Sequence, residues 1–279
     1  MNRRELWPML GGGALGAALL VAPDGAAAAS DATGAAATGG GAAADLDTLE
    51  THVRMRAHPD GRPLYWAYAG TFYGQISGQR TVPLMAVEGI SINRCTPAGA
   101  GVYAYSLREA GWFKDLATGE VLDEWLNPLT GRVVKPKHYY SPQRQRFTAE
   151  KTEPVLDRPF PGLEWTGYLG APQRFAGSVW SSEELLVRTT DPNTGAARVQ
   201  TSLLTLHATA ADLARNAKRV VPTTMAYQTL ASWVPWMDMR DIPGVISWRL
   251  FGKKVERVDE LPPHIVARTR KLHPQLFEG

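Results

Sequence analysis

Short apolar or alternating segments recur along the chain between residues 64 and 251, and clusters of turn residues separate them. In the stretch 101–107, for example, Val102, Tyr103 and Tyr105 stand among small and polar residues. Segments of this length, rich in aromatic and β-branched residues, are typical of β-strands. The pattern predicts strands over 64–73, 82–92, 101–107, 179–190, 197–207, 223–233 and 244–251.

Three turn segments share one sequence chemistry: 115–119, 127–131 and 191–195 each open with Asp or Asn and close with Thr-Gly. The opening side chain can accept a hydrogen bond from the backbone two residues on, and the glycine supplies the positive φ that closes a hairpin. The segments therefore predict antiparallel pairing, with one short strand over 120–126 between the first two turns.

Strands in series without long helices between them predict a mainly β domain. Closure into a barrel removes exposed strand edges, and a barrel of about eight strands can hold one small ligand. We expect an antiparallel lipocalin-like β-barrel, and a two-sheet β-sandwich is the alternative. Short C-terminal helices should follow, because Thr209 and Asp212 resemble a capping box that starts a helix to about residue 220, and Pro262-Pro263 opens a final helix over 264–272.

The first residues predict an export signal. Arg3 and Arg4 precede a modestly apolar run over 7–21, and Ala27-Ala28-Ala29 forms a small-x-small cleavage site. This is the pattern of a twin-arginine signal, and the run is shorter than the roughly 20 apolar residues of a membrane span. We expect residues 1–29 to be the signal peptide, the twin-arginine machinery to export the chain, and the mature protein to be periplasmic or secreted without a stable membrane span.

Residues 30–44 are almost all Ala, Gly and Thr, and because they include no large apolar residue to bury, we expect a flexible spacer. A second small-x-small site at 42–44 leaves the mature start open between Ser30 and Asp45. Residues 45–279 suffice for one large core and contain no internal linker. They are expected to form a single β-barrel domain.

Composition and motifs argue against several classes of function. The net charge is only +3 and the basic residues are scattered, which does not favour nucleic acid as a partner. The single cysteine, Cys95, has no partner for an internal disulfide and stands in a turn-like segment. The histidines show no metal-ligand spacing, and nucleotide-binding and serine-hydrolase motifs are absent from residues 45–279. We therefore expect no cofactor and no metal, although a metal site assembled from distant strands stays open.

Acid–base chemistry remains, and the candidate catalytic residues are Glu88, Arg94, His138 and Glu183. Glu88 interrupts an apolar strand, and burial would raise its pKa into the range of a general acid or base. The alternative for Glu88 is a buried ion pair with an arginine such as Arg94, while Gly89 after it permits close backbone approach. Alternation places Glu183 on the inward face of its strand, and two tyrosines beside His138 could orient its ring.

Aromatic residues are frequent in the folded part, and core packing is their ordinary role. The alternative is a pocket for an aromatic or apolar ligand, which tyrosine favours because a buried phenol needs a hydrogen-bond partner. The candidate ligand-binding residues are Trp66, Tyr68, Tyr73, Tyr103, Tyr105, Trp125, Tyr139, Trp180, His207, Trp233 and Trp236. The segment 233–239, with two tryptophans and two methionines around Pro235, is expected to fold over a barrel mouth as a plug or a lid.

Several segments in combination resemble one family of proteins. They are Tyr65-Trp66 with Tyr68 and Gly70-Thr71, Val87-Glu88-Gly89, the stretch 118–131, Trp233-Val234-Pro235-Trp236-Met237, and Gly252-Lys253-Lys254 with Glu260-Leu261-Pro262. The chain resembles the domain-of-unknown-function family number 1838, bacterial and fungal proteins that often follow twin-arginine signals, from Val53 to Leu276. The resemblance implies no catalytic residues. Barrel-like families of this sort sometimes contain cofactor-free lyases or decarboxylases of phenolic compounds, which is a likeness of fold alone.

Two hypotheses of function follow. The first is an exported, cofactor-independent lyase or decarboxylase that acts by general acid–base catalysis on a hydrophobic aromatic small molecule inside the barrel, with Glu88 or His138 as the base. The alternative is a non-catalytic periplasmic binding or carrier protein for a lipophilic small molecule, and a homo-oligomer stays open in both cases. Convergence of the four candidate residues in a cavity would favour the enzyme, whereas scattered or ion-paired positions would favour binding.

Overall fold

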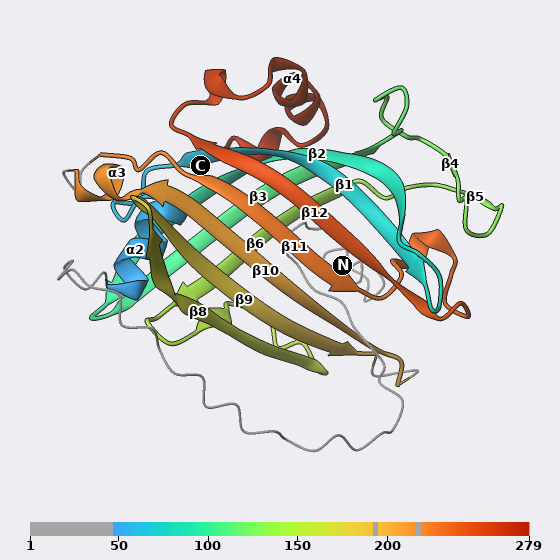
Figure 1. The fold of residues 1–279 in the computed structure, drawn as a ribbon, viewed down its shortest axis with the longest axis horizontal. Coiled ribbons are helices and arrows are strands. Elements are labelled where there is room, and N and C mark those ends of the chain that lie inside the picture. Colours follow the sequence, from blue (N-terminus) through green and yellow to red (C-terminus); the bar gives the residue numbers. More distant parts are fainter. Residues whose placement is uncertain (1–46, 192–194, 216–218, 279) are drawn as a thin grey trace.

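The computed structural model describes residues 47–191, 195–215 and 219–278, and the predicted signal peptide and spacer at 1–44 lie outside them. Ten strands form one closed antiparallel barrel, in the order β1-β12-β11-β10-β9-β8-β7-β6-β3-β2 and back to β1 (Figure 1). The prediction of a barrel rather than a sandwich is therefore confirmed.

The barrel strands are β1 (Leu64–Ile76), β2 (Val82–Gly99), β3 (Val102–Lys114), β6 (Tyr139–Phe147), β7 (Thr152–Pro154), β8 (Leu163–Phe175), β9 (Ser178–Thr190), β10 (Ala197–Thr209), β11 (Thr224–Ala231) and β12 (Gly244–Val255). A separate two-stranded sheet joins β4 (Trp125–Leu126) and β5 (Val133–Val134). The helices are α2 (Thr48–Arg56), α3 (Ala210–Ala214) and α4 (Pro263–Leu272), with 3-10 turns η2 (Pro235–Met237), η3 (Val258–Glu260) and η4 (Pro274–Leu276).

The predicted turns that open with Asp or Asn and close with glycine are present. Gly119, Gly131 and Gly195 have φ angles of 71°, 69° and 70°, and the N–H of each glycine donates to the carbonyl of the Asp or Asn that opens its turn. Glycine is needed there because positive φ is strained for other residues. The strand predicted over 120–126 is shorter than expected: beyond β4, Val121 alone pairs in an isolated bridge with Lys114.

The two predicted helices form, and one is shorter than expected. The Thr209 hydroxyl accepts the N–H of Asp212 at 3.0 Å, but α3 ends at Ala214 rather than near residue 220. Helix α4 ends at Leu272, as expected. Helix α2 is not apparent in the sequence because its buried face includes His52 and Arg56 and so lacks an apolar stripe.

Different segments close the two ends of the barrel (Figure 1). At one end α2 packs against β8, β9 and β10. At the other end the segment 233–239 folds over the opening, where the Trp236 ring lies 6.4 Å from the Phe72 ring and 5.2 Å from the Phe113 ring. Met237 is completely buried, so this segment packs as a plug.

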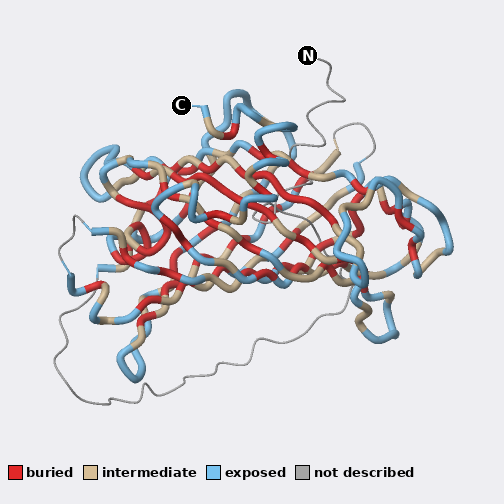
Figure 2. The backbone as a smooth tube through the Cα atoms, turned by 90° about the horizontal axis from the view of Figure 1, so that it is seen from above, coloured by how far each residue is buried: buried red, intermediate tan, exposed pale blue. Residues whose placement is uncertain are grey.

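Strand alternation divides the residues between the inside and the outside of the barrel, and buried residues are concentrated along the strands (Figure 2). In β2 and β3 the odd-numbered residues face inward; Ser91, for example, lies opposite Glu109. The outer face of these two strands is covered as well, because Ile90 and Trp112 pack with Ile265 of α4. Apolar residues therefore stand at consecutive positions there.

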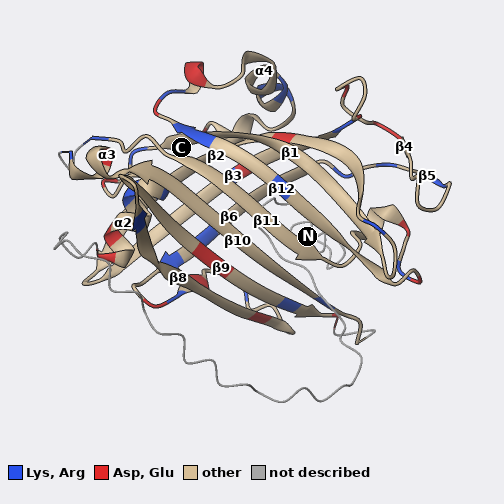
Figure 3. Ribbon diagram, in the orientation of Figure 1, with Lys and Arg blue, Asp and Glu red and all other residues tan. Residues whose placement is uncertain are grey.

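Charged residues of both signs are interspersed over the barrel rather than gathered on one face (Figure 3). This distribution fits the small net charge of +3. Within the part of the chain that the structure describes, no helix has the length and apolar character needed to cross a bilayer.

Candidate functional site

The four candidate catalytic residues do not meet inside the barrel. Glu88 faces outward, where its Oε1 lies 2.9 Å from Lys114 Nζ and 3.2 Å from His264 Nε2 of α4. Arg94 lies on the same outer face of β2 and donates from Nη1 to the Gly61 carbonyl at 3.4 Å. The sequence does not reveal the outward direction of Glu88, because apolar residues on both faces of β2 obscure the period of two.

His138 precedes β6 and is partly buried. Its Nδ1 accepts the backbone N–H of Phe113 at 3.2 Å, so the neutral ring carries its proton on Nε2. Burial lowers the pKa of His138, which favours that neutral form. The imidazole also stacks on the Phe113 ring at 6.2 Å. His138 therefore fixes the end of β3 and does not reach Glu183.

Glu183 faces inward as the alternation predicts, and α2 supplies its partner. Arg56 Nη1 lies 3.2 Å from Glu183 Oε2, with only 4% and 6% of the two side chains exposed. Arg56 Nε also donates to the Tyr105 hydroxyl at 3.0 Å, and that hydroxyl donates to Asn93 Oδ1. We call Arg56, Glu183, Tyr105, Asn93 and His52 the plug cluster; it lies at the α2 end of the barrel, not at the end that the segment 233–239 covers.

The two titratable rings of the plug cluster are neutral near pH 7. Burial, together with the nearby Arg56 charge, lowers the pKa of His52 to about 3, and its Nδ1 lies 3.0 Å from Ser181 Oγ. Burial raises the pKa of Tyr105 to about 12. Because most of these side chains bond to one another, the cluster holds α2 inside the barrel end, and His52 Nε2 is its one buried polar atom without a hydrogen-bond partner among the described residues.

A second polar group lies on the inner wall, and its carboxylate is not among the catalytic residues predicted from the sequence. Glu109 of β3 is 1% exposed and takes part in a hydrogen bond with Tyr68. The Tyr68 hydroxyl also lies 2.9 Å from the Tyr139 hydroxyl. Tyr227 of β11 accepts the Nε2 hydrogen of Gln200 at 3.3 Å. We call Glu109, Tyr68, Tyr139 and Tyr227 the tyrosine belt.

Burial keeps the phenols of the tyrosine belt neutral. It raises the pKa of Tyr68 and of Tyr139 well above the ordinary range, and the negative charge of Glu109 acts in the same direction. Burial also raises the pKa of Tyr227. Neutral phenols beside a carboxylate are hydrogen-bond donors, and such donors stabilise an oxygen that gains negative charge.

Two glycines make room for the tyrosine belt. A Cβ atom on Gly89 would lie 2.3 Å from the Tyr68 hydroxyl oxygen, and one on Gly111 would lie 2.3 Å from the Tyr139 hydroxyl oxygen. Gly89 and Gly111 are register partners, so the wall is bare where the two phenols lie against it. The close approach expected at Gly89 is thus present, with a tyrosine as the approaching group.

The candidate ligand-binding residues divide between the two faces of the wall. Those on the inside or at its closed ends are Trp66, Tyr68, Tyr103, Tyr105, Trp125, Tyr139, Trp233 and Trp236. Tyr73, Trp180 and His207 lie on the outer face. There the Tyr73 ring lies 4.6 Å from the Arg249 guanidinium, and the Trp180 ring lies 5.2 Å from the His207 ring. These three do not line the interior, because each alternates out of phase with buried neighbours on its own strand.

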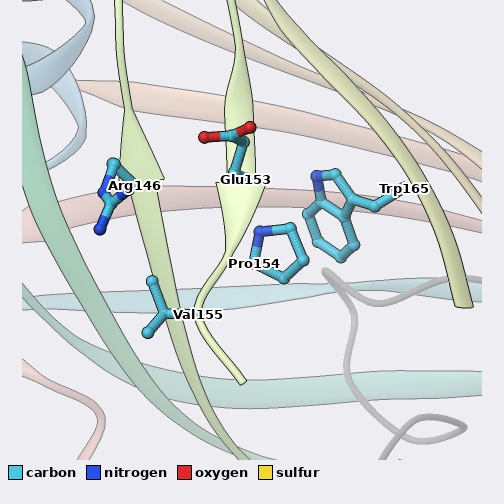
Figure 4. Close-up of a pocket in the computed structure, with 5 residues that line it drawn as sticks. All are labelled: Arg146, Glu153, Pro154, Val155 and Trp165. Atoms are coloured by element: carbon cyan, nitrogen blue, oxygen red, sulfur yellow. The ribbon is translucent and has the colours of Figure 1, made fainter. Parts of the chain in front are cut away.

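A pocket of about 400 Å³ opens in the wall beside β7 (Figure 4). Its lining residues are Arg146, Glu153, Pro154, Val155 and Trp165. Strand β7 pairs with β6 through three residue pairs but with β8 through Thr152 and Gly167 alone. We call this part of the wall, between β6 and β8, the seam; it is not among the sites predicted from the sequence.

The described residues include no group of three or more His, Cys, Asp or Glu side chains that could hold a metal ion. The buried charged groups instead contact other protein groups, as Arg56 contacts Glu183.

A family model described as a protein of unknown function (DUF1838) matches residues 61–278. No curated protein matches the chain. Among solved structures, DynF from the dynemicin biosynthesis pathway of Micromonospora chersina is 12% identical with a TM-score of 0.29, covering 74% of this chain and 83% of DynF. Ail, the attachment invasion locus protein of Yersinia pestis, is 11% identical with a TM-score of 0.25, covering 70% and 99%. Neither likeness bears on function.

Proposed function

The chain belongs to the DUF1838 family, and from that premise we propose that it is a cofactor-independent enzyme that performs acid–base chemistry on a hydrophobic aromatic small molecule inside its barrel. The observation that carries the proposal is the tyrosine belt. It combines a buried carboxylate, Glu109, with a hydrogen-bonded pair of neutral phenols on the inner wall. Titratable groups in such surroundings mark candidate catalytic sites.

The chemistry assigned to the belt is proton transfer with stabilisation of an oxyanion. Glu109 takes a proton from the substrate, and the hydroxyls of Tyr68 and Tyr139 donate hydrogen bonds to the substrate oxygen that gains negative charge. Elimination of a leaving group or loss of CO₂ follows, and Glu109 returns its proton to the product or the leaving group. The reaction class is therefore that of a lyase or decarboxylase, with Glu109 in the role first expected for Glu88 or His138.

The substrate class follows from the neighbours of the belt. The rings of Phe113 and Trp248 lie 6.3 Å and 5.8 Å from the ring of Tyr139. An aromatic substrate would find edge-to-face partners in this cluster, a geometry that favours ring binding beyond simple burial.

A non-catalytic binding or carrier function is the second candidate, and one observation favours it. Glu183, the inward-facing residue of the four predicted catalytic groups, is already paired with Arg56 in the plug cluster. In a binding protein, Glu109 and Tyr68 would recognise a polar group of the ligand without moving a proton.

Native mass spectrometry of the protein purified from its own host, followed by identification of the released small molecules, supplies the substrate for the test. Wild type, Glu109→Gln and the matched control Glu88→Gln on the outer wall are then incubated with that compound. We expect turnover by wild type, unchanged turnover by the control, and a loss of about 10²-fold or more in Glu109→Gln with the compound still bound. Retention without turnover in wild type would support the carrier, and equal turnover in all three proteins would eliminate Glu109 as the base.

We also propose that the chain is exported through the twin-arginine route, on the pattern of residues 3–29. Replacing Arg3 and Arg4 together by lysine should retain the precursor in the cytoplasm. Cell fractionation measures this, and undiminished export of the double-lysine variant would count against the proposal.

A further inference from the structure

The seam is the place where the barrel wall is held by the fewest contacts. Strand β7 contains only three residues, and a single residue pair, Thr152 with Gly167, joins it to β8. Strand β8 continues from Leu163 past this pair, so its first residues have no pairing partner on the β7 side among the described residues. A wall held in this way can open locally at low cost, because few backbone hydrogen bonds have to break.

The pocket at the seam combines flat apolar groups with two charged register partners, Arg146 and Glu153. Its volume of about 400 Å³ is in the range of small-molecule sites. The Trp165 indole and the Pro154 ring are among its lining groups (Figure 4). Glu153 forms its ion pair with Lys151 at 2.6 Å, whereas Arg146, which lies opposite Glu153 in the strand register, has no salt bridge to any residue that the structure describes. A planar ring with a carboxylate matches this set of groups.

Two polar atoms on the inner side of the seam have no hydrogen-bond partner within the described part of the chain. They are Gln145 Oε1 and Thr152 Oγ1, on side chains only 3% and 1% exposed. Gln145 is the register partner of Pro154, which lines the pocket. Buried polar atoms are normally bonded, so these two are available to a ligand that passes through the wall.

A polar track connects the seam to the tyrosine belt. The inward positions of β6 after Tyr139 are Ser141, Gln143 and Gln145, and Gln143 Nε2 donates to Ser141 Oγ at 3.0 Å. Ser141 is the register partner of Glu109. At about 3.3 Å per residue, the track from Gln145 to Ser141 is about 13 Å long.

We propose that the seam is the port through which a planar aromatic carboxylate enters the barrel. Arg146 binds its carboxylate, Trp165 and Pro154 hold its ring, and the polar track leads from the pocket to Glu109. The proposal rests on the proposed function for its destination, whereas recognition at the pocket rests on the lining residues alone.

The port is tested with a switchable disulfide. A Cβ on Gly167 would lie 2.2 Å from Thr152 Oγ1, so the double variant Thr152→Cys/Gly167→Cys places two thiols across the seam. The native Cys95 is 1% exposed, and burial raises the pKa of its thiol to about 12, so it does not interfere. With 2-naphthoate as the probe and stopped-flow tryptophan fluorescence as the readout, association should be at least about tenfold slower in the oxidised form and recover on reduction. Equal rates in the two forms would overturn the port.

Recognition is tested independently by two neighbouring arginines on β6. Arg146→Gln should weaken 2-naphthoate binding by about tenfold, the size expected for a lost charge-assisted hydrogen bond. Arg144→Gln is the matched control, since Arg144 already pairs with Asp157, and it should leave binding unchanged. Uncharged 2-naphthamide should bind wild type and Arg146→Gln equally. Equal effects of the two substitutions on 2-naphthoate binding would overturn recognition by Arg146. This test does not depend on the disulfide, so it still decides the question if the double-cysteine variant does not fold.

The failures of the two proposals are distinguishable. If the port is wrong and the enzyme is right, Arg146→Gln and the disulfide change nothing, while Glu109→Gln still lowers turnover of the native compound by about 10²-fold or more. If the enzyme is wrong and the port is right, both seam changes slow or weaken 2-naphthoate binding, and no variant or wild type turns the native compound over.

Discussion

The ion pair of the plug cluster gives the sharpest prediction of stability. Arg56 and Glu183 are 3.2 Å apart and almost fully buried, so replacing Arg56 by methionine leaves a carboxylate without its counter-charge in the barrel interior. Breaking a buried pair from one side typically costs about 3–5 kcal/mol. For a domain of this size, that corresponds to a fall in the melting temperature of roughly 6–20 °C.

The matched variant removes both charges. Arg56→Met/Glu183→Leu places apolar groups of similar volume at both positions, and such replacements are often close to neutral, so the double variant should recover most of the loss. Arg56→Lys should fall between wild type and Arg56→Met, because an ammonium cannot reach Glu183 and the Tyr105 hydroxyl in the same forked geometry.

Urea unfolding followed by tryptophan fluorescence measures these differences as changes in the free energy of unfolding. A cost of less than about 1 kcal/mol for Arg56→Met, the value of an exposed pair, would show that water reaches the carboxylate and would refute the reasoning. The reasoning would also fail if the double variant were as unstable as the single one.

Three further outcomes are expected. Gly89→Ala should lower the free energy of unfolding by about 1–3 kcal/mol because its methyl would meet the Tyr68 hydroxyl, and adding Tyr68→Phe should recover part of that loss in the same urea assay; no recovery would contradict the contact. The unfolded chain protonates His52 near its ordinary pKa of 6.5 and the folded protein only near 3, so stability should fall as the pH decreases through this range, by up to about 1.4 kcal/mol per pH unit, and His52→Asn should flatten that dependence. The Cys95 thiol, buried and with a pKa raised to about 12, should react with a water-soluble aromatic disulfide only after unfolding in urea, and rapid labelling of the native protein would show that the barrel end is open.

Local chemistry made the turns and many strands predictable. The glycines at 119, 131 and 195 take the positive φ that their positions after Asp or Asn and Thr require, and those turns fix where the neighbouring strands end. Glu183 is correctly placed inward because β9 has one covered and one exposed face, so its buried and exposed residues alternate. The sequence is therefore sufficient to predict a turn whose conformation depends on its own residues, and to predict the direction of a side chain on a strand with only one covered face.

The direction of Glu88 and the role of Glu109 depend on packing that no short segment records. Helix α4 buries the outer face of β2, so Ile90 and Ile92 are as apolar as the inward residues and the period of two disappears. The inward direction of Glu109 could have been predicted from the sequence, because the alternation set by Tyr103 and Tyr105 continues to position 109. The strand was predicted to end at Leu107, however, two residues too early to include it.

The contacts of α2 have a consequence for the order of assembly. Although α2 precedes every strand in the chain, His52 meets Ser181 129 residues later, and the Lys254 ammonium donates to the Arg54 carbonyl 200 residues before it. No partner of such separation exists until most of the barrel strands have been made, and closing loops of this length costs entropy that only the finished barrel repays. Helix α2 can therefore complete these two contacts only after β9 and β12 have formed, so the barrel must be nearly complete before this helix can seal its end.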